Sequence, residues 1–104
     1  MTPLQINGSH VKLIGDVDFS TSHTFLPTLT EVLVTYNLIE LDMSAVTYID
    51  SSGLGLIVSL TKKAKVLGLY PDEVVILTNV SRPIRRVLDM SGIIALIKVK
   101  GEDL

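Results

Sequence analysis

The sequence predicts a single α/β domain built on a mixed β-sheet. Two short apolar runs near the N-terminus alternate with polar residues, as in a β-hairpin, and apolar runs then alternate with amphipathic segments along the chain. A hairpin followed by alternating strands and helices predicts a sheet that is parallel in its later part, with helices packed on it. With 104 residues, 47% of them hydrophobic, the chain has the size and composition of one domain spanning residues 1–104.

Composition and charge exclude several classes of protein. The net charge is −2 and the lysines and arginines are scattered, so we expect no nucleic-acid partner. The chain has no cysteine, which excludes disulfides and thiolate chemistry. Its N-terminus lacks the basic and apolar stretches of a signal peptide, and no apolar run approaches the ~20 residues of a membrane span. We therefore expect a cytoplasmic protein.

The N-terminal part of the chain predicts a hairpin followed by a helix. Asn7-Gly8 separates alternating runs at 3–7 and 10–15, and both residues tolerate the positive φ of a tight turn. A loop over 15–18 should follow. Ser20, Thr21 and Ser22 then offer caps for the helix.

Pro27 conflicts with a regular first helix. Proline is tolerated only in the first turn, so the helix is expected to start late, near His23 or Thr24, or to be distorted at Pro27. A short strand over 38–42 and a turn over 43–49 are predicted next.

The second half of the chain predicts two more helices and two more strands. A helix from about Ser52 to Gly68 is indicated by apolar residues at helical spacing: Leu54, Ile57, Leu60, Ala64 and Leu67. After a loop over 70–72, the apolar run 74–77 is typical of a strand covered on both faces. A helix should open at 81–83 and stop at 91–92, and a last strand should cover 94–99.

The most informative segment is Asp50-Ser51-Ser52-Gly53-Leu54-Gly55, where an apolar run meets a helix. Free amides and the positive dipole end favour an anion at such a place. Each glycine costs about 1 kcal/mol against alanine in a helix interior. Close approach of a strand or a partner would offset that cost, as would a need for exposed N–H groups. The alternative is purely structural, with Asp50 or Ser51 as a cap and the glycines allowing tight packing.

The residues do not predict an enzyme, a cofactor or a metal site. The segment lacks the lysine and spacing of a P-loop and is too short for a dinucleotide-binding fingerprint. His10 and His23 are the only imidazoles and are expected on the surface rather than beside a nucleophile. The four aspartates near these motifs lack metal-loop spacing: Asp16, Asp18, Asp42 and Asp50.

Leu56 lies off the apolar stripe of this helix. If exposed near Ser51 it is a candidate partner contact, and if covered it belongs to the core. Both interpretations remain open from the sequence.

Four segments together resemble a known family. Residues 49–55 resemble the signature of the STAS domain of bacterial anti-sigma-factor antagonists, and 15–18, 41–44 and 87–92 are similar to further segments of that family in the same order. The likeness covers nearly the whole chain. It implies a STAS-like mixed sheet in which the family's usual C-terminal helix is absent or very short.

The resemblance also implies roles for individual residues. Ser51 matches the serine that is phosphorylated by the cognate anti-sigma factor, a serine kinase of the histidine-kinase-like ATPase type. Asp50 would help to position the hydroxyl or the kinase's metal, and Asp18 would contact the partner from the adjacent loop. Ser52, Gly53 and Leu54 would form the docking edge.

The implied function is a phosphorylation switch. The unphosphorylated protein, a monomer when free, would bind the anti-sigma factor and free the sigma factor; phosphorylation at Ser51 would end binding, and a serine phosphatase would restore it. Two alternatives use the same fold. One is a non-switching scaffold or transport-complex subunit, and the other is a small nucleotide-binding protein that uses the amides at Gly53.

Overall fold

A computed structural model describes residues 3–101 of the chain. Ten elements follow one another: β1 (Leu4–Asn7), β2 (His10–Val17), α1 (Phe19–Tyr36), β3 (Ile39–Ile49), α2 (Ser51–Val66), α3 (Pro71–Val74), β4 (Val75–Thr78), α4 (Arg82–Ser91), the 3₁₀ helix η1 (Ile93–Leu96) and β5 (Lys98–Lys100).

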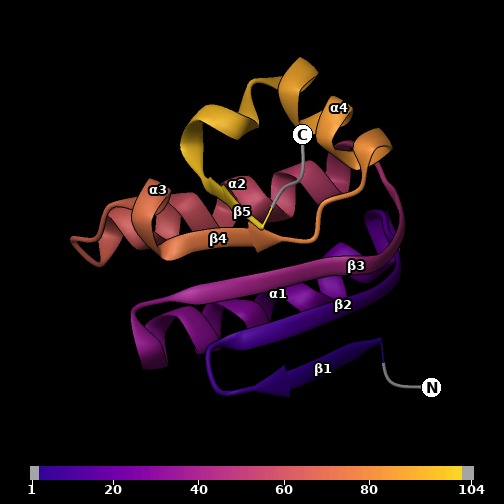
Figure 1. Cartoon of the computed structure of the whole chain (residues 1–104). Coiled ribbons are helices and arrows are strands. Elements are labelled where there is room, and N and C mark those ends of the chain that lie inside the picture. Colours follow the sequence, from indigo (N-terminus) through magenta and orange to yellow (C-terminus); the bar gives the residue numbers. More distant parts are fainter. Residues whose placement is uncertain (1–2, 102–104) are drawn as a thin grey trace.

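The strands form one mixed sheet in the order β1-β2-β3-β4-β5. β1 pairs antiparallel with β2, whereas the other three pairs are parallel, which confirms the predicted mixed sheet. Figure 1 shows α1 and α2 on the same side of this sheet. Because each helix follows a parallel strand, both helices begin at the same edge of the sheet.

The N-terminal hairpin is confirmed, with its turn one residue later than predicted. Asn7 pairs with His10, so Gly8 and Ser9 are the central residues of the turn. Gly8 has φ +62° and Asn7 does not have a positive φ. Glycine at the first central position is typical of a II′ turn, which fits the twist of the flanking strands.

β2 is longer than predicted, and no loop covers 15–18. The strand continues to Val17, which pairs with Ile49 and is 1% exposed. Asp18 alone separates β2 from α1, and it caps the helix. Pairing with β3 along the whole strand explains why these residues are extended.

α1 begins before Pro27 by more than one turn, so the expected late start is wrong. The helix starts at Phe19, capped by Asp18 rather than by Ser20, Thr21 or Ser22, and Pro27 lies inside it. Pro27 cannot donate to the carbonyl of His23, but both residues are exposed, so water can satisfy that carbonyl. Phe25 and Leu29 on the buried face stabilise the helix on either side of the proline.

β3 is one strand from Ile39 to Ile49, and the predicted turn over 43–49 is wrong. The register with β2 shifts twice, between Lys12 and Ile14 and between Gly15 and Asp16, and each shift accommodates one extra residue of β3. These bulges break the strict alternation of buried residues, so Met43, Val46 and Ile49 are buried at intervals of three residues. The irregular spacing made this part of the strand look like a turn.

The second half differs from the prediction at two places. The segment expected as a loop at 70–72 includes the first residues of the short helix α3. The predicted strand 94–99 is instead η1 followed by the three-residue β5. α4 ends as predicted, because Gly92 takes the left-handed conformation (φ +80°) that stops a helix. Residues that would follow β5 as a C-terminal helix lie mostly outside the described range.

The core lies between the sheet and the helices and is aliphatic apart from Phe25. Val75 and Leu77 of β4 belong to it, while Ile76 points to the opposite face, since side chains alternate along a strand. Ile76 is nevertheless only 7% exposed, between Glu40 and Lys98 in the register. The apolar run in β4 therefore does not require a helix on each face. No helix within residues 3–101 is long and apolar enough to cross a membrane.

Candidate functional site

Two helix N-termini lie side by side at one edge of the sheet. β2 and β3 end at the paired residues Val17 and Ile49, and each strand is followed by an aspartate that caps the next helix, Asp18 for α1 and Asp50 for α2. The backbone N–H of Asp50 donates to the carbonyl oxygen of Val17 across 3.4 Å. The parallel register thus brings together two carboxylates that are 32 residues apart in the sequence.

Asp50 is a helix cap. Its Oδ1 accepts hydrogen bonds from the backbone N–H groups of Ser52 (2.9 Å) and Gly53 (3.2 Å). These amides would otherwise lack partners at the start of α2. The interpretation of Asp50 as a helix cap is therefore correct. Two of the amides expected to be free for an external anion already donate to the carboxylate of Asp50.

Ser51 is the first residue of α2 and is exposed. No hydrogen bond to its hydroxyl occurs within the part of the chain that the structure describes. The hydroxyl is therefore accessible to another protein.

Asp18 is held as an anion by its own helix. Its Oδ1 accepts from the backbone N–H of Thr21 (3.1 Å), while its own N–H donates to Oγ1 of Thr21 (2.9 Å), forming a reciprocal capping box. The hydrogen bond from the Thr21 amide lowers the pKa of the Asp18 carboxyl below its ordinary 3.8. This edge of the molecule therefore carries a fixed negative charge at neutral pH.

Gly53 is required by packing inside the molecule. A Cβ at this position would collide with the carbonyl oxygen of Val17 and would lie 2.6 Å from Cγ1 of Ile49. The residue is also buried. Close approach of a strand, one of the reasons offered from the sequence, is thus the reason for this glycine.

Gly55 has no such reason. A Cβ there would meet nothing within 4 Å, and the residue is exposed. Since a helix glycine costs about 1 kcal/mol against alanine, its presence is not explained by the packing of this chain alone.

The predicted docking residues divide into a surface group and a buried group. Leu56 is 3% exposed and belongs to the core, so of the two interpretations left open from the sequence the covered one is correct. Its side of α2 is covered because α1 packs alongside, which the spacing within one helix cannot reveal. Leu54 is half-buried against the same core. Gly53 is buried as well. The surface group consists of Ser51, which is exposed, and of the half-buried polar residues Asp18, Asp50 and Ser52.

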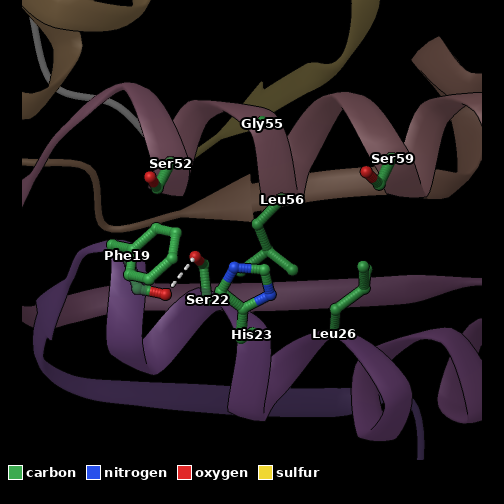
Figure 2. A pocket seen from close by; sticks show the side chains of 8 residues that line it. All are labelled: Phe19, Ser22, His23, Leu26, Ser52, Gly55, Leu56 and Ser59. Atoms are coloured by element: carbon green, nitrogen blue, oxygen red, sulfur yellow. Dashed lines mark hydrogen bonds between the residues drawn. The ribbon is translucent and has the colours of Figure 1, made fainter.

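Sequence reasoning missed a groove between α1 and α2, next to Ser51. It has a volume of about 250 Å³ and is lined by Phe19, Ser22, His23, Leu26, Ser52, Gly55, Leu56 and Ser59. Figure 2 shows side chains from the two helices facing one another across it. Phe19 is 66% exposed and stacks edge-on against His23, with ring centroids 4.6 Å apart. An aromatic residue directly after the cap Asp18 was the available signal.

Nε2 of His10 lies 2.6 Å from a carboxylate oxygen of Glu40 on the sheet, and His23 packs edge-on against Phe19. Within residues 3–101 neither imidazole makes a hydrogen bond to a serine. Within residues 3–101, no three side chains of the His, Asp or Glu type gather where they could hold a metal ion.

Asp42 ties the middle of β3 to the end of β4. It accepts hydrogen bonds from the Ser44 N–H (2.9 Å) and from Nδ2 of Asn79 (3.1 Å). Partial burial acts to raise the pKa of this carboxyl, but these hydrogen bonds outweigh it, so the pKa lies below its ordinary 3.8. The geometry indicates a structural role for Asp42.

Comparison with known proteins places this geometry among related structures. The family model described as the STAS domain matches residues 2–102. A putative anti-sigma factor antagonist from Thermotoga maritima is similar, with 24% identity, 98% of this chain and 86% of that chain covered, and a TM-score of 0.75. The Bacillus cell-fate determinant SpoIIAA in its phosphorylated form is 20% identical over 95% of this chain and 90% of that chain, with a TM-score of 0.63.

A third structure of the same fold has a different printed description. A sulfate transporter family protein from Wolinella succinogenes is 17% identical, with 89% of this chain and 76% of that chain covered and a TM-score of 0.69. At these identities the likeness to the solved structures shows the fold.

Proposed function

This chain belongs to the STAS domain family, and we propose on that basis that it is an anti-sigma-factor antagonist switched by phosphorylation of Ser51. The unphosphorylated form binds an anti-sigma factor that is also a serine kinase of the histidine-kinase-like ATPase type, and the sigma factor is thereby released. Phosphorylation ends this binding, and a serine phosphatase restores it. The protein acts in the cytoplasm and is a monomer when free.

The observation that carries the proposal is the exposed Ser51 hydroxyl beside two capping carboxylates. Its position at the first residue of α2 makes the oxygen accessible without unfolding of the helix. The neighbouring anions Asp18 and Asp50 sit on helix ends that fix their positions. A protein that binds at this edge of the sheet therefore contacts side chains whose positions are already fixed.

The modification is a phosphoryl transfer in which this chain is the substrate. Oγ of Ser51 attacks the γ-phosphorus of the kinase's ATP, the bond to ADP breaks, and the hydroxyl proton passes to a base of the kinase. Asp50 contributes by position. Its Oδ1 serves the helix amides, while Oδ2 accepts no hydrogen bond from the described part of the chain and is available to orient the hydroxyl or a Mg²⁺ ion that arrives with ATP.

Release follows from the charge that the modification adds. Phosphoserine carries about −1.5 to −2 charges at neutral pH. The amides of Ser52 and Gly53 are already bonded to Asp50, so they are not free to neutralise the phosphate. The phosphate charge therefore adds to the charges of Asp18 and Asp50. Binding of a partner that removes all three groups from water becomes unfavourable, because their desolvation is costly and they repel one another.

Two substitutions at Ser51 test the switch. We expect Ser51→Asp to lose at least tenfold in affinity for the histidine-kinase-like ATPase that co-purifies with the chain, because it places a carboxylate at the interface. Ser51→Ala should bind as wild type does but should not accept phosphate. Titration calorimetry measures the first effect, and mass spectrometry after incubation with the ATPase and ATP maps the phosphosite.

The controls separate the switch from its alternatives. Incubation with ATP and magnesium alone should give no turnover and no self-phosphorylation, because Asp50 rather than a nucleotide occupies the amides at Gly53. Equal affinity of wild type, Ser51→Asp and Ser51→Ala for the ATPase would show that Ser51 does not control binding.

A transport-associated subunit is the second candidate. The similarity in fold to the sulfate transporter family protein is the observation that favours it. In that case a membrane transport protein, rather than an ATPase, should co-purify with the chain, and Ser51 should remain unmodified.

A further inference from the structure

The groove between α1 and α2 is lined at the start of α2 by Ser52, the residue after Ser51. We propose that it is the docking site for an amphipathic α-helix of the protein partner, which lies antiparallel to α2 and inserts large apolar side chains between the two helices. This inference rests on the proposed function, because it describes how the partner that reads Ser51 is held.

The walls and floor of the groove are chemically distinct. Phe19 and Leu26 are the apolar side chains of the α1 wall, with Ser22 and His23 between them, and Leu56 is the apolar floor. Figure 2 shows the small residues Ser52, Gly55 and Ser59 along α2. No lysine, arginine or carboxylate lines the cavity. Its volume of about 250 Å³ is below the ~300–1,000 Å³ of pockets for drug-sized ligands, which suits inserted side chains better than a free cofactor.

The same face of α2 continues beyond the cavity. Ser52, Gly55, Ser59, Lys62 and Val66 follow at spacings of three and four residues, which places them along one side of a helix. Val66 is 78% exposed at the far end, as Phe19 is at the near end. From Ser52 to Val66 this face is about 21 Å long at 1.5 Å per residue, enough for a helix of about four turns.

Gly55 supports close approach by the partner's backbone. It lies in the middle of the groove, it is exposed, and nothing in this chain occupies the space of its missing side chain. A glycine that costs helix stability without a packing reason inside the chain is explained when another backbone passes over it.

Charge complementarity sets the direction of the bound helix. The carboxylates of Asp18 and Asp50 lie at the N-terminal end of the groove, and Lys62 and Lys63 follow it on α2 at the other end. A helix usually carries anions in its first turn and cations in its last, as its dipole favours. Such a helix meets both ends of the groove with opposite charges only when it runs antiparallel to α2.

The small residues along α2 of a second copy of this chain do not fill the groove. Its α2 would present Ser52, Gly55 and Ser59, so small side chains would face small side chains and the cavity would stay empty. Packing of helices requires large side chains of one partner in the gaps of the other. The occupant is therefore a helix with Leu-, Ile-, Met- or Phe-sized residues at the contact.

Gly55→Leu tests the site by filling the groove from within. We expect affinity for the purified ATPase to fall at least tenfold, while the urea midpoint of the variant stays equal to or above that of wild type because a helix glycine is removed. Thr24→Leu is the matched control, since it places the same side chain on an exposed position of α1 outside the groove. The control should bind as wild type does.

A synthetic peptide tests the groove without the ATPase and without Ser51. The probe is a 16-residue helix with leucine at spacings of three and four, glutamates in its first turn, lysines in its last turn and a spin label at its C-terminus. We expect the amide signals of residues 19–26 and 52–66 to shift on binding, with paramagnetic broadening strongest at 51–55. Lys62→Glu combined with Lys63→Glu should weaken binding, more so at low salt.

Each of the following results would overturn the proposal in whole or in part. Gly55→Leu binding the ATPase as tightly as wild type excludes the groove as the docking site, and peptide shifts outside both segments, or their absence, do the same. Broadening at 62–66 refutes the antiparallel direction. A concentration-dependent dimer that Gly55→Leu abolishes assigns the groove to a second copy. If Ser51→Asp binds normally while Gly55→Leu does not, the docking site stands and the phosphorylation switch fails.

Discussion

At the scale of single residues, Gly53 holds the N-terminus of α2 against the end of β2. Its missing side chain lets the helix backbone reach the Val17 carbonyl, and this contact places Asp50 and Ser51 at the sheet edge beside Asp18. Gly55, two positions along, has the same residue type without any internal contact. The two glycines therefore have different causes.

Substituting each glycine by alanine should separate these causes. Gly53→Ala should destabilise the fold by about 1–3 kcal/mol, because the new Cβ overlaps backbone and a buried side chain. Gly55→Ala should stabilise it by about 0.5–1 kcal/mol, because the space is open and helix propensity improves. Urea unfolding of both variants measures the difference, and equal effects of the same sign would contradict the packing argument.

At the scale of elements, α1 contains a proline that its surroundings tolerate. The capping box at Asp18 and the buried residues Phe25 and Leu29 stabilise the helix, and His23, whose carbonyl cannot accept the usual hydrogen bond from Pro27, is an exposed residue. Stability of this helix therefore comes from its ends and its packed face rather than from its backbone hydrogen bonds at Pro27.

Pro27→Ala should consequently raise the stability of the domain. The substitution restores the hydrogen bond to the His23 carbonyl, and the loss of proline's restriction of the unfolded chain offsets part of that gain. We expect a net gain of about 1–2 kcal/mol. Thermal unfolding measures it, with Thr24→Ala as a control on the same helix. A loss of stability would mean that α1 packs correctly only with the proline in place.

Sequence patterns identified most elements but not their limits. The hairpin, the long second helix and the stop at Gly92 follow from local rules about turns, periodicity and positive φ, and the structure has all three. The sequence predicts a strand over 38–42 only, because bulges break the alternation along β3. Pro27 indicates a late start for α1, although tertiary packing maintains that helix from Phe19. These errors arise where contacts between elements override local preference.

In the candidate site, too, local features could be predicted from the sequence and contacts between elements could not. An acid followed by small residues between a strand and a helix identified Asp50 as a capping candidate from the sequence alone. The burial of Leu56 and the groove beside Phe19 depend on how α1 lies against α2, which no spacing within one helix contains.

At the scale of the whole molecule, two aspartates make stability depend on pH. The pKa values of Asp18 and Asp42 are lowered in the folded state, so the unfolded chain binds more protons as the pH falls below about 4. Their contribution is complete above the ordinary pKa of aspartate and is lost as the pH falls through the lower, folded value.

We therefore expect the urea midpoint to be insensitive to these groups between pH 5 and pH 7, given ordinary values of about 4, and to fall in more acidic solution. Asp18→Asn combined with Asp42→Asn should flatten the acidic part of the profile, because asparagine can still cap but does not titrate. An unchanged acidic slope in the double variant would assign the effect to other carboxyl groups.

The self-capped start of α2 has a consequence for how the state of this protein can be detected. Asp50 already bonds the helix amides, and Gly53 pins the helix to β2, so a phosphate on Ser51 finds no internal groups to rearrange. Under the proposed phosphorylation of Ser51, the two forms would share one shape and differ in surface charge. Native electrophoresis or ion-exchange elution should separate the two forms, whereas their circular dichroism spectra and small-angle scattering profiles should be the same.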